Sequence, residues 1–94
     1  MTEIDVRCTP AGDGWACRVT VREGDSSTSH DVRVGREELE RLAPGAAEPT
    51  ALVRAAFAFL LEREAKESIL RVFDLPVIGR YFPGWEADVR RRLG

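Results

Sequence analysis

Apolar and polar residues alternate strictly in three runs within the first third of the chain. The apolar residues fall on even positions in Ile4–Cys8, on odd positions in Trp15–Val21 and on even positions again in His30–Val34. Alternation with period two is typical of β-strands that are buried on one face only. The pattern therefore predicts three strands, at about 3–9, 15–23 and 27–34.

The change of parity between these runs predicts how the strands pair. Gly12-Asp13 and Gly24-Asp25 lie between them and are strong signals for two-residue hairpin turns. Across such a hairpin, opposed position numbers add to the sum of the two turn positions, which is 25 for the first turn and 49 for the second. Both sums are odd, so all three apolar sets share one face. We expect a three-stranded antiparallel β-meander with one apolar face and one exposed face of mixed charge.

The pattern changes to a helical one after the third strand. Gly35–Leu42 predicts a short helix, and the segment at about 50–65 has the strongest helical signal, without an internal Gly or Pro. Its apolar residues spread over roughly 200° of the circumference, about twice the arc of an ordinary surface helix. This central helix must therefore be covered on two sides. One cover is the sheet, and the other is either the C-terminal helices or a second protomer.

The last third predicts short helices. The apolar positions after Glu64 leave the arc of the central helix, so we expect a kink or break near 66–68, with Ser68 as a helix cap. Asp74 and Pro76 form a further helix start signal. The expected helices cover about 68–73, 76–82 and 85–93. The sequence thus predicts an α+β fold in a single domain, 1–94, with the central helix packed on the sheet.

Composition narrows the class of protein. The 94 residues carry a net charge of −2, and the acidic excess lies in the first half of the chain. Acidic residues near Met1, where a signal peptide would carry basic ones, and the lack of a long apolar run favour a cytoplasmic protein that has no membrane segment. Two cysteines are too few for a disulfide scaffold, and we expect them to be reduced in that compartment.

Cys8, Cys17 and His30 are the one cluster of soft ligands. The expected register places Cys8 opposite Cys17 on the inner face, with His30 facing the same way. A structural zinc site needs four ligands, and the chain has no second His. The favoured interpretation is two small buried thiols with His30 at the edge of the sheet. A cross-strand redox pair of Cys8 and Cys17, or a metal-linked site with His30, remains as an alternative function.

Catalysis is not indicated. With one His, a nucleophile–base arrangement would depend on His30 alone, and no phosphate-binding loop or metalloprotease motif occurs. We expect neither an enzyme nor a bound cofactor or metal.

Nucleic-acid binding is a second alternative. Residues 67–82 could form a helix-turn-helix, but the second helix is short, mostly apolar and interrupted by Gly79. The side chains that could contact a phosphate backbone are Arg80, Arg90, Arg91 and Arg92. The lack of a dense basic face argues against a regulator that binds nucleic acid through these arginines.

Aromatic residues gather near the C-terminus. Arg80, Tyr81, Phe82 and Trp85 are of the types that dominate protein interfaces, with Phe59 on the central helix as a further candidate. They could instead lock the last helix onto the central one. We expect a small non-enzymatic protein-interaction or regulatory module that binds a protein partner or a second copy of itself, with a homodimer as one form.

A longer pattern covers the second half of the chain. It comprises Phe57–Glu64, Ser68–Arg71, Phe73–Leu75, Ile78 and Tyr81–Pro83. This stretch, FxFLLEREx(3)SILRxFDLxxIxRYFP, resembles one in small bacterial proteins of unknown function. The resemblance implies that these residues act together as one unit, and it carries no activity, cofactor or catalytic residue.

Overall fold

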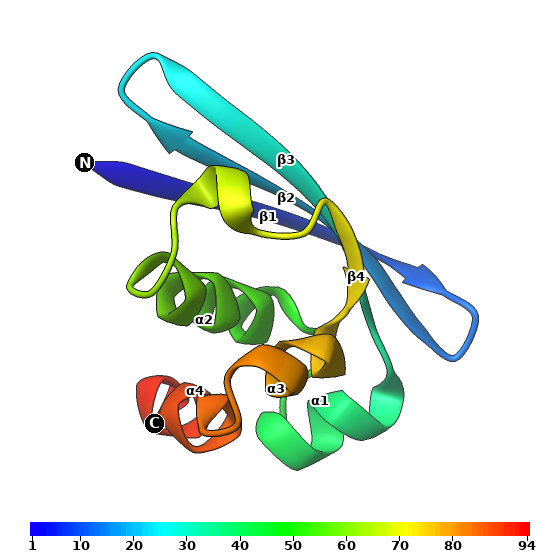
Figure 1. Cartoon of the computed structure of the whole chain (residues 1–94). Helices are drawn as coiled ribbons and strands as arrows, with labels where there is room; N and C mark the ends of the chain where they lie inside the picture. Colours follow the sequence, from blue (N-terminus) through cyan, green and yellow to red (C-terminus); the bar gives the residue numbers. More distant parts are fainter.

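The computed structural model describes all residues, 1–94, and confirms the α+β class. A twisted sheet forms one layer and the helices cover one of its faces (Figure 1). The elements are β1 (Thr2–Ala11), β2 (Gly14–Glu23), β3 (Ser26–Val34), α1 (Arg36–Leu42), α2 (Thr50–Leu61), η1 (Lys66–Ser68), β4 (Val72–Asp74), η2 (Leu75–Val77), α3 (Ile78–Tyr81) and α4 (Trp85–Leu93). No helix has the length and apolar character needed to cross a bilayer.

The meander has the predicted register, residue for residue. Cys8 pairs with Cys17, and Val19 pairs with His30. Gly12 and Gly24 have φ of 59° and 58°, the left-handed conformation that the two hairpin turns require and that glycine adopts without strain. On the outer face, which has the mixed charge that the sequence predicted, Arg18 and Asp31 form a cross-strand ion pair.

The segment after α2 differs from the prediction. The expected helix at 68–73 is wrong: the chain forms only the short turn η1 and then the strand β4, which pairs in parallel with β3. The amide of Asp31 donates to the carbonyl of Arg71 over 2.7 Å. The third strand of the meander has unpaired groups along its outer edge, and this extended segment satisfies them. Phe73 then points inward onto Phe57, with 6.1 Å between the ring centres.

The central helix is shorter than expected. α2 ends at Leu61, not near 65, and Ala65 is already extended, with ψ of 153°. The break brings Lys66 across to the end of β2, where its ammonium lies 3.4 Å from the carboxylate of Glu23 and 2.7 Å from that of Glu67. Ser68 ends the turn η1 and does not cap a helix.

Both sides of α2 are covered within the chain. Phe57 faces the sheet, where it meets His30 at 5.3 Å between ring centres. Phe59 faces the C-terminal segment and meets Phe82 edge to face at 5.8 Å. The sheet and the C-terminal helices therefore share one core of 21 residues. This arrangement answers the question raised by the wide apolar arc, because a second protomer is not needed to bury it.

Candidate functional site

The aromatic residues near the C-terminus divide into two groups. Trp85 and Phe59 are 1% and 2% exposed and belong to the core, so neither offers a surface to a partner. Phe82 is half-buried against Phe59. Tyr81 is 63% exposed, and Arg80 beside it is exposed as well. Of the five candidate interaction residues, only Arg80, Tyr81 and the outer part of Phe82 remain accessible.

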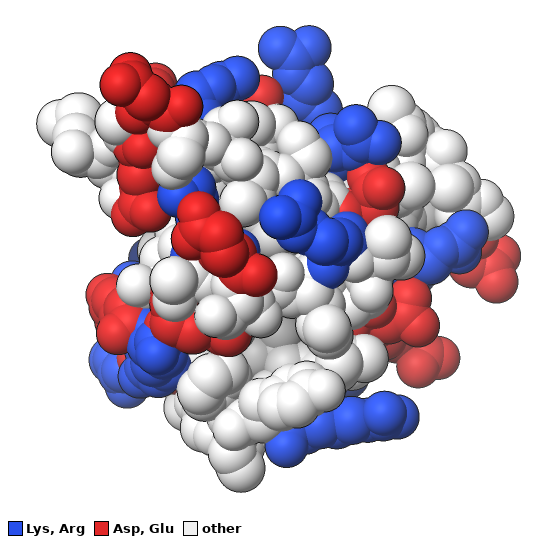
Figure 2. Space-filling view, turned by 45° about the horizontal axis from the view of Figure 1, so that its top comes forward, with Lys and Arg blue, Asp and Glu red and all other residues white.

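A pocket opens beside these accessible residues, between the end of α2, the η1–β4 segment and α3. We call it the α2–α3 pocket. It has a volume of about 180 Å³, and eight of its ten lining residues are hydrophobic. The lining consists of Leu60, Glu64, Ser68, Ile69, Leu70, Phe73, Val77, Ile78, Tyr81 and Phe82. The space-filling view in Figure 2 shows one face of the molecule, and the lower part of this face has an uncharged, hollowed area. Basic and acidic groups are mixed over the upper part of the same face.

Two polar residues, Ser68 and Glu64, interrupt the apolar lining, and only Glu64 carries an ionisable group of the two. It is half-buried, and its desolvation by the pocket wall raises the pKa of its carboxyl above the ordinary value. No neighbouring positive charge offsets this effect. A partly desolvated carboxylate without a partner is a favourable position for a cation.

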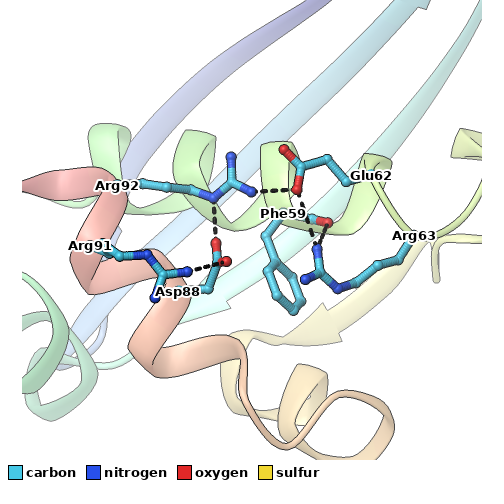
Figure 3. A network of polar contacts seen from close by, with 6 residues as sticks. All are labelled: Phe59, Glu62, Arg63, Asp88, Arg91 and Arg92. Carbon is cyan, nitrogen blue, oxygen red and sulfur yellow. Dashed lines mark hydrogen bonds and ion pairs between the residues drawn. The ribbon is translucent and has the colours of Figure 1, made fainter.

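Beside the pocket, α2 packs against α4. Figure 3 shows the polar network that joins them. The guanidinium of Arg92 binds Asp88 on its own helix and Glu62 at the end of α2, the latter at 2.6 Å. The guanidinium of Arg63 lies over the ring of Phe59, 3.7 Å from its centre, and donates to the Phe59 carbonyl. These contacts hold Phe59, and through it Phe82, in place.

The same network occupies the arginines that were candidates for nucleic-acid contact. Arg91 and Arg92 both bind Asp88, one helical turn before them. Arg90 donates to the carbonyl of Arg41, and the guanidinium of Arg41 in turn pairs with Glu86. Arg80 lies apart from them on α3. The four arginines therefore form no continuous basic face.

The cluster of soft ligands is separated into two parts. Cys8 and Cys17 are joined in a disulfide, with their Cα atoms 4.0 Å apart, so the expectation of reduced thiols is not met. The directly opposed register explains the bond, because it brings the two side chains together on one face. No group of three or more His, Cys, Asp or Glu residues is placed to hold a metal ion. A redox role of the pair stays a prediction.

His30 is not at the edge of the sheet, because β4 pairs outside β3. It is 1% exposed, and both ring nitrogens have partners. Nδ1 lies 2.8 Å from the carbonyl of Leu70 and must donate to it, so Nε2 accepts from the hydroxyl of Thr28, also at 2.8 Å. Burial lowers the pKa of the imidazole. His30 thus anchors the η1–β4 segment to the sheet and, with it, one wall of the pocket.

Sequence reasoning found the neighbourhood of the pocket and missed part of its lining. The sequence analysis placed Glu64 at the end of the central helix, which stops before it, and Leu70 in a helix that does not form. The available signal was the run Ile69-Leu70, which leaves the apolar arc of α2 and therefore had to face something other than the sheet.

Comparisons with known proteins add no assignment. No protein-family model, curated protein or solved structure matches this chain. Any statement about function therefore rests on the residues and geometry described above.

Proposed function

We propose that the protein is a non-enzymatic interaction module whose α2–α3 pocket receives one apolar side chain of a partner protein, next to a basic side chain that pairs with Glu64. The observation that carries the proposal is an open apolar pocket with one carboxylate in its wall that lacks a positive neighbour. Apolar area provides affinity, and the single charge provides selectivity.

The size of the pocket favours a side chain over a small-molecule ligand. Its volume of about 180 Å³ is close to that of an apolar cavity of about 150 Å³ that holds benzene. Sites for drug-sized ligands and cofactors usually have about 300–1,000 Å³. A leucine or phenylalanine side chain matches the available space.

The rim of the pocket supports the same assignment. Leu70 and Tyr81 are 45% and 63% exposed, although both are large and apolar enough to be buried. Tyrosine next to a pocket is typical of residues that contribute most to protein–protein affinity. A partner that inserts one side chain would also cover these two residues.

Capped dipeptides test the proposal in its smallest form. Amide chemical shifts of the ¹⁵N-labelled protein are followed by NMR during titration with acetyl-Phe-Arg-amide and, separately, with acetyl-Phe-Glu-amide. We expect shifts at Leu70, Phe73 and Ile78, and severalfold tighter binding of the arginine peptide, since a partly exposed ion pair contributes about 0.2–1 kcal/mol. Glu64→Gln should remove the preference, whereas Glu37→Gln on α1 should leave it unchanged.

A pair of variants separates the pocket from general surface stickiness. Leu70→Asp places a charge on the pocket rim and should abolish binding of the arginine peptide. Val72→Asp changes a residue that is even more exposed, at 73%, but does not line the pocket, and it should bind normally. Shifts scattered over the molecule, or equal binding by both variants, would contradict the proposal.

A further inference from the structure

β1 is the outer strand of the sheet, with only β2 beside it (Figure 1). The hydrogen bond from the Asp31 amide to Arg71 shows that odd residues of β3 face β4. The backbone groups of the even residues of β3 must therefore bond to β2, where their partners are the odd residues. The even residues of β2 then bond to β1, where their partners are again the odd residues. The backbone groups of the even residues of β1 therefore point away from the sheet.

These free groups form a regular row over most of the strand. They belong to Thr2, Ile4, Val6 and Cys8. Pro10 continues the row and lacks an N–H at the place where one would point to solvent, as is typical of prolines in edge strands. No bulge interrupts the pairing of β1 with β2 from Thr2 to Ala11. A long, regular edge is a template for one more strand.

We propose that the partner of this edge is the β1 strand of a second copy, paired antiparallel about a twofold axis at Val6. In this register Val6 lies opposite its own counterpart, and Ile4 lies opposite Cys8 of the other copy. All of these are residues with outward N–H and C=O groups, so the hydrogen-bond patterns match. Because even residues oppose even residues, the apolar faces of the two sheets lie on the same side.

Charge selects this register over its neighbours. Centring on Val6 places Asp5 opposite Arg7 of the other copy, twice, in the closely spaced non-hydrogen-bonded positions. Both side chains are accessible, at 41% and 81% exposure, and in the single chain they pair with each other along the strand, with 3.4 Å between Arg7 Nε and the Asp5 carboxylate. Centring on Asp5 would oppose two aspartates at the axis, although it would also place Arg7 opposite Glu3 of the other copy. Centring on Arg7 would oppose two arginines with no compensating pair, so only the Val6 register has opposite charges and no like-charge pair. The chain therefore carries one register in which backbone, face and charge agree.

The helical layer lies on one side of the joined sheet. α2 packs beneath β1, and its exposed flank carries Ala51, the long side chain of Arg54 and the partly exposed Ala58. No strand other than β2 pairs with β1. This surface is separate from the α2–α3 pocket, so dimer formation and peptide binding can succeed or fail independently.

Sedimentation velocity over a wide concentration range, up to millimolar, tests the dimer. We expect a reversible shift to twice the 10.5 kDa mass of the chain. Asp5→Arg opposes like charges at two places and should weaken the dimer about tenfold or more. Asp5→Arg combined with Arg7→Asp restores opposite charges and should recover it. Glu3→Arg makes the same change of charge on the same face of the sheet, but residue 3 lies opposite the uncharged Thr9 of the other copy. This variant should therefore have little effect on the dimer.

Cross-linking tests the register directly. A mixture of an Asp5→Cys protein and an Arg7→Cys protein should form a mixed disulfide under mild oxidation, because the opposed Cα atoms lie about 4.5 Å apart. Each variant alone should cross-link poorly, since its two cysteines would be diagonal neighbours. A monomer at every concentration, or equal weakening by Asp5→Arg and Glu3→Arg, would overturn the proposal.

Discussion

The buried imidazole makes the stability of the fold dependent on pH. His30 is the only histidine in the chain, it is 1% exposed, and its folded form is the neutral tautomer with Nδ1–H bonded to Leu70. Burial is the largest influence on its pKa and lowers it; Arg71 acts in the same direction, while the bond to Leu70 and the charge of Asp31 act against it. Protonation would also place a second N–H against the Thr28 hydroxyl, which now donates.

The sign and size of the effect follow from proton linkage. The unfolded chain accepts a proton on His30 near pH 6.5, whereas the folded protein resists it down to a lower pH. The stabilising effect of the neutral imidazole is therefore complete above about pH 6.5 and is lost as the pH falls below it. The free energy of unfolding should decrease by up to about 1.4 kcal/mol for each pH unit until the lowered pKa is reached.

Urea unfolding at a series of pH values between about 5 and 8 measures this dependence. His30→Asn keeps a side-chain N–H that can donate to Leu70, but the asparagine does not titrate. The free energy of unfolding of this variant should be lower overall and should not change with pH in the range where that of the wild type decreases. Glu64→Gln serves as a second control. The raised pKa of Glu64 stabilises the folded state as the pH falls toward 5 and partly masks the effect of His30. Parallel curves for wild type and His30→Asn would refute the reasoning.

Three further predictions concern stability and use chemical denaturation. The Cys8–Cys17 disulfide closes a loop with a sequence separation of 9, and its reduction should lower the free energy of unfolding by up to about 2.7 kcal/mol on the chain-entropy estimate. Reductant should have no effect on the stability of the variant in which both cysteines are replaced by alanine. Gly14→Ala should prevent normal hairpin pairing, because an added Cβ would lie 2.1 Å from the carbonyl oxygen of Val34; a stable variant would contradict that geometry. Trp85→Ala should cost about 3–5 kcal/mol, since the ring is fully buried, while retention of the wild-type midpoint would show that α4 is dispensable.

The strands and their register could be predicted because the information is local. Each hairpin is specified by a two-residue turn and by alternation on both sides of it, and the glycines at 12 and 24 have the positive φ that the turns need. The short helix α1 likewise follows from neighbouring residues, with the Glu38 carboxylate accepting from the Gly35 amide at its start. Elements determined by contacts within about ten residues are the ones that pattern reasoning recovers.

The segment between α2 and α3 could not be predicted in this way. Ile69 and Leu70 fit a helix as well as an extended segment, and the choice depends on the open edge of β3, some 40 positions earlier in the chain. The site shows the same limit. Residue types at 80–85 indicated the right neighbourhood, but the three-dimensional packing alone decides that Trp85 is buried and Tyr81 is exposed.

The parallel strand β4 has a consequence for local opening of the structure. It is only three residues long, whereas β1, β2 and β3 have nine or ten residues each. The segment can therefore detach while the three-stranded meander remains folded, and the amide of Asp31, whose acceptor is Arg71, marks that event. Hydrogen exchange at this single amide would report the partial unfolding that also dismantles one wall of the pocket, while its neighbour Val32, bonded within the meander, would exchange only on deeper unfolding.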